Sequence, residues 1–215
     1  MGLTLDYETS GFLEEYNPDF NSNAMDYSGR HCFKEQPGVL AWDLVKLAEA
    51  LKIISDFPEN ISILKKNYME TFQKEYNVKM REKMGFFKNE SEDLTLIKDF
   101  LKLLETSKGD YTRGFRFLSS MEFPINVEKT MIEIKGFCSN QIDNENWIKF
   151  FDDYEKRIKK EELTIISIQE KMQLVNPRFV IRAKELKEAM DLMLNEEGNM
   201  NGVNRIYDEI LNAFK

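Results

Sequence analysis

The chain is poor in the side chains that most often build metal centres and nucleophilic sites. Its 215 residues include two cysteines, Cys32 and Cys138, and one histidine, His31. Neither the ligand spacing of a metal site nor the cysteine density of a secreted disulfide scaffold is present, so a reducing compartment is the simple inference. Catalysis by a Ser-His or Cys-His pair could use only His31. Because neighbours in a chain generally point apart, we interpret His31 and Cys32 as structural.

Long apolar runs and an excess of basic charge are also missing. No stretch approaches the ~20 consecutive apolar residues of a membrane-spanning helix, and the first residues have no signal-peptide or transit-peptide pattern. The formal net charge of −8 argues against a broad nucleic-acid-binding surface. A basic stretch at residues 156–160 has acidic neighbours, which favours a solvated helix face. We therefore expect neither a membrane nor a nucleic-acid partner.

The chain does contain enough apolar mass for a core. Hydrophobic residues make up 42% of it, and it has 16 phenylalanines and 8 tyrosines. Its length fits one large domain or two small ones. Apolar residues recur mainly at helical spacing, and signals of helices outnumber those of strands. The composition and spacing together predict a mainly α fold.

Start and stop signals place the first helices. Pro37 stands in the first turn of one predicted helix, and Pro58 precedes a second that ends near Gly85. Ser91 is predicted to cap a third helix, and Asp110 a short fourth one through about residue 121.

The second half of the chain is harder to divide. Residues 123–146 contain proline, glycine and a polar, turn-prone stretch, and are predicted to be an irregular linker or insertion. A long helix is expected from residue 147, with a break at Pro177 before another helix through about residue 194. Gly198 and Gly202 are expected to bracket a loop, after which an amphipathic helix closes the chain.

One carboxylate near the start of the chain stands where metal ligands often do. The apolar residues 3–5 predict a short strand, Asp6 follows it, and a long turn-rich loop begins beyond. Mg²⁺ bound to a nucleotide takes one or two carboxylates together with phosphate oxygens. A lone aspartate after an apolar run is more often a turn former or a helix cap, however, and the residue type alone favours that interpretation.

Several short blocks follow one another along the chain. They are GLTLDY at 2–7, GFL at 11–13, NPDF at 17–20, SGR at 28–30, QP at 36–37, WDL at 42–44 with KLAEAL at 46–51, DYT at 110–112, FRFL at 115–118 and NPRFVIR at 176–182. In this order they resemble the selenoprotein O (SelO) family, kinase-like enzymes that transfer AMP onto proteins. Ordered blocks over most of the chain are more specific than any single short motif.

The resemblance implies a fold, a ligand and a reaction. It implies the helical C-terminal part of a protein kinase-like fold, in which Asp6 corresponds to the aspartate that contacts Mg²⁺ (or Mn²⁺) and the phosphates of ATP. The substrates would be proteins, of which a Ser, Thr or Tyr hydroxyl attacks the α-phosphorus of ATP and releases pyrophosphate. No catalytic residue is assigned. A eukaryotic member of the family would be mitochondrial and a bacterial member cytoplasmic.

Parts that the family places upstream of this segment do not occur in the sequence. These are the glycine-rich nucleotide loop, the phosphate-contacting lysine with its glutamate partner, and the Asp and Asn of the catalytic loop. We therefore expect a C-terminal fragment that lacks its N-terminal lobe and is inactive by itself. The alternative is a non-catalytic helical module that binds other proteins.

The chain also departs from the family pattern at three places. Residues 8–10 read Glu-Thr-Ser where the family has a turn-forming Gly-Pro, which puts the loop geometry beside Asp6 in doubt. Residues 21–23 lack the cysteine of many bacterial members, so a redox role there is not supported. Arg182 is followed by Ala183, where the family commonly has a polar side chain.

The expected organisation has four parts. Residues 1–35 carry the metal aspartate, its strand and an activation-type loop, and residues 36–122 form a helical C-lobe. Residues 123–146 form the linker or insertion, and residues 147–215 the C-terminal helices.

Four further features leave alternatives open. The sequence GDYTR at 109–113 could begin a phosphate-binding helix, but a capped helix start explains it without a ligand. Arg30, Arg116 and Arg182 lie in the family blocks and could orient the loop or contact a substrate protein. Pairing with a buried carboxylate is the more common fate of such an arginine.

Overall fold

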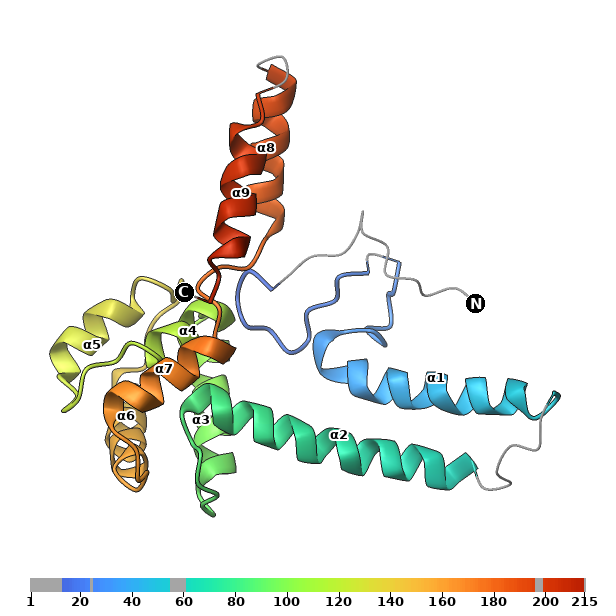
Figure 1. The fold of residues 1–215 in the computed structure, drawn as a ribbon, viewed down its shortest axis with the longest axis horizontal. Helices are drawn as coiled ribbons and strands as arrows, with labels where there is room; N and C mark the ends of the chain where they lie inside the picture. Colours follow the sequence, from blue (N-terminus) through green and yellow to red (C-terminus); the bar gives the residue numbers. More distant parts are fainter. Residues whose placement is uncertain (1–12, 24, 55–60, 196–198, 215) are drawn as a thin grey trace. The chain divides into compact units, whose positions relative to one another are not determined.

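The fold is mainly α, as the apolar spacing predicts. The computed structural model describes residues 13–23, 25–54, 61–195 and 199–214, which form helices joined by loops (Figure 1). Within these ranges the β-structure is limited to an isolated bridge between Gly109 and Cys138. The chain divides into two compact units: residues 1–10 with 18–79, and residues 11–17 with 80–215. The strand predicted at residues 3–5 lies outside the described residues, and the kinase-like fold stays a prediction.

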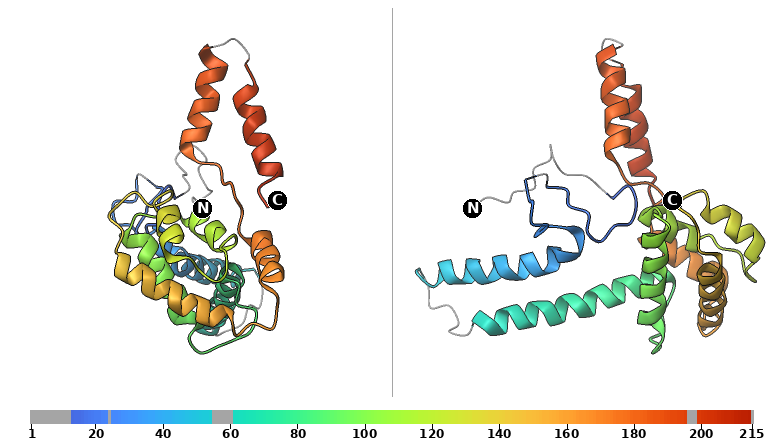
Figure 2. Two further views of the ribbon diagram at one scale, coloured as in Figure 1. Left: turned by 90° about the vertical axis from the view of Figure 1, so that its left-hand side faces the viewer. Right: turned by 180° about the vertical axis from the view of Figure 1, so that it is seen from behind.

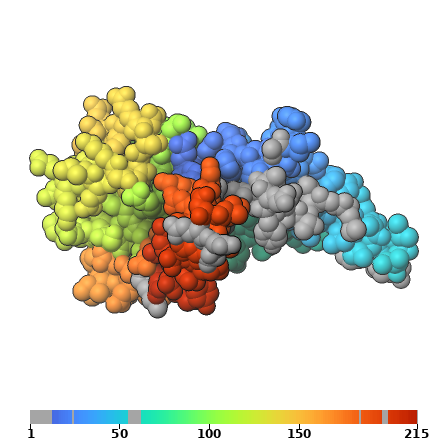
Figure 3. Space-filling view, turned by 90° about the horizontal axis from the view of Figure 1, so that it is seen from above, coloured from blue at the N-terminus to red at the C-terminus, as the bar shows by residue number. Residues whose placement is uncertain are grey.

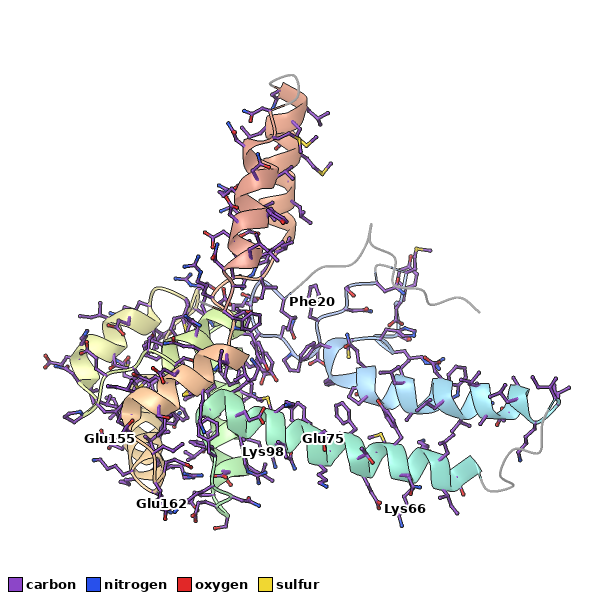
Figure 4. The ribbon with its side chains drawn as sticks, viewed as in Figure 1. Phe20, Lys66, Glu75, Lys98, Glu155 and Glu162 are labelled. Carbon is purple, nitrogen blue, oxygen red and sulfur yellow. The ribbon has the colours of Figure 1, made fainter. Side chains whose placement is uncertain are left out.

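The described part of the first unit contains a loop, a short 3-10 helix and two α-helices. A short 3-10 helix, Phe33–Glu35, leads into α1 (Gln36–Leu51), which begins where Pro37 predicts. Helix α2 (Ile61–Met84) runs on into the second unit and ends at Gly85, whose positive φ of 77° suits a glycine. Both predicted boundaries are confirmed. Lys66 and Glu75, labelled in Figure 4, are exposed side chains of α2.

The second unit contains the remaining helices. They are α3 (Asp93–Thr106), α4 (Tyr111–Leu118), α5 (Val127–Ile134), α6 (Asn144–Ile158), α7 (Ile165–Val175), α8 (Ala183–Asn195) and α9 (Asn201–Leu211). Four of them start at a side chain that accepts a hydrogen bond from the first turn, namely Asp110, Asn126, Asp143 and Thr164. Such caps satisfy N–H groups that the helix itself leaves free.

The structure corrects several predicted boundaries. Helix α3 follows Glu92 rather than Ser91, and α5 lies inside the segment predicted as irregular. The long helix expected from residue 147 is two helices, because α6 ends at Ile158 and Thr164 caps α7. Helix α5 lies at the surface of the second unit, where its yellow atoms are uncovered in Figure 3.

Gly202 lies inside α9 rather than in the predicted loop. A Cβ atom at this position would stand 2.7 Å from the Cα atom of Ala189, so glycine allows α8 and α9 to approach closely. The two helices run side by side as a hairpin in all ribbon views (Figure 2). Close packing therefore explains a glycine whose sequence context resembles a loop.

Aromatic side chains fill the core of the second unit. The ring of Phe100 on α3 lies 5.1 Å from the ring of Phe115 on α4 and 5.3 Å from that of Phe150 on α6. Trp147 completes the contact at 6.1 Å, and both Phe100 and Trp147 are fully buried. Rings at these distances add to the hydrophobic gain of burial, so this cluster contributes to the stability of the unit.

A buried ionic network crosses the same core. The guanidinium of Arg157 contacts Asp93 at 2.5 Å and Glu161 at 2.7 Å, and Arg81 contacts the second oxygen of Asp93 at 2.9 Å. The side chains of Arg157 and Asp93 are fully buried. The prediction that residues 156–160 form a solvated face is therefore wrong for Arg157. It holds for Lys156, whose side chain is exposed.

The helices were also compared in length and polarity with a membrane-spanning segment. Within the ranges that it describes, every helix is too short or too polar to cross a bilayer.

Candidate functional site

The predicted metal ligand, Asp6, lies outside the described residues, so its role stays a prediction. Among the residues that the structure describes, no group of three or more His, Cys, Asp and Glu side chains could hold a metal ion. What the structure does describe is the loop that follows Asp6 and the places where the downstream family blocks meet.

Asp26 organises the part of this loop that belongs to the first unit. Its carboxylate accepts hydrogen bonds from the backbone N–H of His31 at 2.7 Å and from the hydroxyl of Ser28 at 2.8 Å. The amide of Asn21 donates to its backbone carbonyl at 2.8 Å. The bonds to the carboxylate, that from the His31 backbone first and that from Ser28 after it, hold the pKa of Asp26 well below its usual range. Gly29, at a φ of 68°, allows the chain to turn here.

The neighbouring pair His31 and Cys32 has structural surroundings. The Nδ1 atom of His31 lies 3.2 Å from the carboxylate of Asp26, and Cys32 is buried with 5% of its surface exposed. The backbone N–H of Phe33 donates to the carbonyl of Phe20, labelled in Figure 4, at 2.9 Å. These contacts close the loop on itself and support the structural interpretation of the pair.

Arg30 connects two of the family blocks. Its guanidinium carbon lies 4.3 Å from the centre of the Trp42 ring, and the ammonium of Lys46 lies 5.7 Å from the same ring. Stacking of a guanidinium on an indole is a favourable cation–π contact. Arg30 is therefore oriented by an aromatic ring. Among the described residues it has no carboxylate partner, although pairing with a buried carboxylate is the more common arrangement for such an arginine.

Arg182 is paired with a buried carboxylate, as is expected for such an arginine. Its Nη2 atom lies 2.7 Å from a carboxylate oxygen of Asp110, and both side chains are largely buried. The other oxygen of Asp110 accepts from the backbone N–H of Arg113 at 3.0 Å and so caps α4. The predicted cap is confirmed. Because the carboxylate and its arginine occupy the start of α4, the structure favours the capped helix over a phosphate-binding helix start.

Residues 14–16 are attached to this pair within the second unit. The backbone N–H of Tyr16 donates to the carbonyl of Gly109 at 2.7 Å, and the ring of Tyr16 stacks on that of Tyr111 at 5.5 Å. Arg182 reaches the backbone carbonyl of Glu14 at 3.4 Å. Blocks far apart in sequence thus meet at the start of α4 and fix the chain ten residues after Asp6.

Asn176 is the centre of a second junction between the family blocks. Its fully buried amide donates to the carbonyl of Lys83 at 2.8 Å and to the hydroxyl of Ser119 at 3.0 Å. Arg116 donates to the backbone carbonyls of Asn176 at 3.0 Å and Gln173 at 3.4 Å. These bonds satisfy backbone groups where α7 ends, and they make Arg116 a structural residue here.

Lys83 is a charged residue that the sequence patterns do not single out. Its ammonium donates to the side-chain oxygen of Asn176 at 2.9 Å and to the carbonyl of Val175 at 3.2 Å. It lies 5.0 Å from the ring of Phe115 and 5.7 Å from that of Tyr111. Burial lowers the pKa of Lys83 to about 8. One sequence feature could have indicated that Lys83 is buried. It stands one residue before Met84, which the apolar pattern of α2 places in the core.

Comparison with known proteins identifies the chain's relatives. The family model "Protein adenylyltransferase SelO" matches residues 1–211. The chain is 31% identical over 214 residues to "Protein nucleotidyltransferase YdiU" of Salmonella newport (strain SL254), and equally similar to the protein of that name from Salmonella dublin. The match covers 100% of this chain and 42% of each relative. The chain thus spans less than half the length of the curated relatives it matches.

Proposed function

The chain belongs to the SelO family of protein adenylyltransferases, and from that premise we propose that it acts in the transfer of AMP from ATP to hydroxyl groups of proteins. The observation that carries the proposal is the family match, which extends over residues 1–211 and so includes Asp6. The reaction joins a Ser, Thr or Tyr oxygen to the α-phosphorus of ATP, breaks the bond to the β-phosphate and releases pyrophosphate.

In this proposal Asp6 holds Mg²⁺ or Mn²⁺ together with ATP. A bound divalent ion supplies neutralisation of phosphate charge, which dominates the catalysis of such transfers. The described residues would act by positioning. The ion pair of Arg182 with Asp110 and the backbone bond from Tyr16 to Gly109 hold the chain that leads away from Asp6.

The 215 residues alone are proposed to transfer no AMP. Their sequence contains no glycine-rich phosphate loop and no paired catalytic-loop Asp and Asn in the family's positions. Since alignment and charge neutralisation supply most of the rate, one carboxylate by itself is expected to leave almost no activity. Labelled-AMP incorporation by the purified chain that Asp6→Ala abolishes would overturn this expectation.

The proposed role can be tested in a chimera. Residues 1–211 would replace the matching part of the Salmonella newport relative, and transfer from α-labelled ATP to protein would be measured. We expect transfer by the chimera, loss of transfer with Asp6→Asn, and retention with Asp99→Asn, which changes an exposed aspartate on α3. A chimera that folds by circular dichroism but is insensitive to Asp6→Asn would contradict the proposal.

The second candidate function, a non-catalytic interaction module, is favoured by the α8–α9 hairpin. Leu194 is 78% exposed, Tyr207 60% and Met190 59%. Exposed apolar side chains gathered on one hairpin are typical of binding surfaces. Light scattering of the purified chain tests this second candidate function. A stable monomer that recruits no partner would count against an interaction module.

A further inference from the structure

The surface of the first unit is hollowed between its loop and its two helices. The depression has a volume of about 810 Å³, and among its lining residues are Asp19, Arg30, Lys34, Glu35, Trp42 and Lys65. Its basic and aromatic groups face a common space. We propose that this depression binds an acidic peptide segment, with Arg30 as the residue that receives a carboxylate of the peptide.

Arg30 has the geometry of a receptor for a carboxylate. It is exposed, and its guanidinium is held 4.3 Å from the centre of the Trp42 ring. Among the residues that the structure describes, no Asp or Glu side chain is paired with it. A guanidinium held on an aromatic face keeps its N–H groups directed outward, and its planar fork matches a carboxylate with two parallel hydrogen bonds.

The charges around Arg30 favour an anion. Lys34 is neutralised by Asp19 at 2.5 Å, which leaves Arg30 and Lys65 against the single carboxylate of Glu35. The depression is therefore locally positive in a chain with a net charge of −8. A local reversal of sign is a condition for binding an acidic segment in a definite place.

A peptide fits these features better than a nucleic acid does. Repeated phosphates would be repelled by the net negative charge of the chain, whereas one or two carboxylates meet only the local field. Trp42 is 44% exposed, so its ring can also contact apolar atoms of a peptide beside the charged group. The inference goes beyond the proposed transfer of AMP, because such binding needs neither ATP nor a metal.

Binding of labelled peptides to the purified chain tests the proposal. A fluorescein-labelled peptide that carries one Glu and one Asp would be titrated by anisotropy at 50 mM salt, beside the same peptide with Gln and Asn in those places. We expect binding of the acidic peptide alone, weakened about tenfold by Arg30→Gln, which corresponds to about 1.4 kcal/mol. Arg205→Gln, an equal change of charge at an exposed arginine of α9, is the matched control and should change nothing.

Two further variants separate this site from general charge effects. Glu35→Gln removes the opposing carboxylate and should tighten binding severalfold, and Trp42→Leu should weaken it. Trp147 is fully buried, so quenching of tryptophan emission by acrylamide reports mainly on Trp42 and should decrease when peptide binds. Equal binding of the amide peptide, equal effects of Arg30→Gln and Arg205→Gln, or stronger binding of single-stranded DNA would each overturn the proposal.

Discussion

The two units of the chain use aromatic residues differently. In the second unit the rings of Phe100 and Phe150 stack at 5.3 Å and are almost fully buried. In the first unit Phe72 stacks on Tyr68 at 6.2 Å and on Tyr76 at 5.9 Å along one face of α2, yet Tyr76 is 40% exposed and Phe72 is only partly buried. Similar ring contacts therefore occur with very different removal of surface from water.

The difference matters because hydrophobic stabilisation scales with the apolar area that folding buries, at about 25 cal/mol per Å². A face of stacked but exposed rings gains less from folding than an enclosed cluster. Segments with few buried contacts open at a lower free energy than the core of a protein. We therefore expect the second unit to carry most of the stability, and the first unit to depend on local polar contacts.

The largest expected effect comes from the buried network of the second unit. Asp93→Ala would leave Arg157 buried without the carboxylate that it contacts at 2.5 Å. Breaking a buried ion pair from one side typically costs about 3–5 kcal/mol. The free energy of unfolding from urea titration should fall by that amount. Asp99→Ala, at an exposed position of the same helix, should change it by less than about 0.5 kcal/mol.

The direct comparison of the two units uses one substitution in each. Phe100→Ala removes a fully buried ring and should lower the free energy of unfolding by about 3–5 kcal/mol. Phe72→Ala removes a partly exposed ring and should lower it by about 1 kcal/mol, since less area is returned to water. Urea titration of both variants measures the difference. Equal losses would show that the first unit has a core as complete as that of the second.

A smaller effect should appear at alkaline pH through Lys83. Burial lowers its pKa from 10.5 to about 8 in the folded protein, so between these values the unfolded chain binds more protons. Stability from this group therefore rises with pH across that window. Relative to Lys83→Met, the wild type should gain about 2 kcal/mol between pH 7 and pH 10. The difference between the two proteins cancels the other titrating groups. A constant difference would show that Lys83 is as hydrated as a surface lysine, for which Lys98→Met provides the control.

The smallest effect concerns the loop of the first unit. The pKa of Asp26 is lowered, chiefly by the backbone bond from His31, so its stabilisation is present near neutral pH and is lost as the pH falls below the usual value of 3.8. Asp26→Asn should speed hydrogen exchange at the His31 amide while leaving the amides of α3 unchanged. Exchange followed by NMR at pH 6 measures this. Unchanged protection at His31 would indicate that the loop is held by other contacts.

Local sequence signals were sufficient wherever a helix has a strong boundary residue. Pro37 and Gly85 mark the start of α1 and the end of α2, and Asp110 caps α4, because the favoured backbone angles and the capping oxygen act within a few residues. Other boundaries carry no such local signal. The turn between α6 and α7 lacks a proline or glycine, and Gly202 occurs inside a helix for the sake of packing on Ala189.

The family blocks identified the chain without any coordinates, and the candidate ligand Asp6 still rests on them. The sequence did not indicate which of these blocks contact one another in space. Arg182 and Asp110 lie far apart in the sequence, and no local pattern relates them. The same holds for Lys83 and Asn176, whose contact crosses from the end of α2 to the end of α7.

The sequence by itself determined the helical class, the family and the strongest helix boundaries, because these depend on spacing and caps within a single turn. Only the tertiary structure decided the fates of the charged residues. Arg157 is buried and Lys156 exposed on one helix, and Arg30 lies on a tryptophan while Arg182 binds a carboxylate. The environment of a charge depends on the segments that fold against it, and a linear pattern does not contain that information.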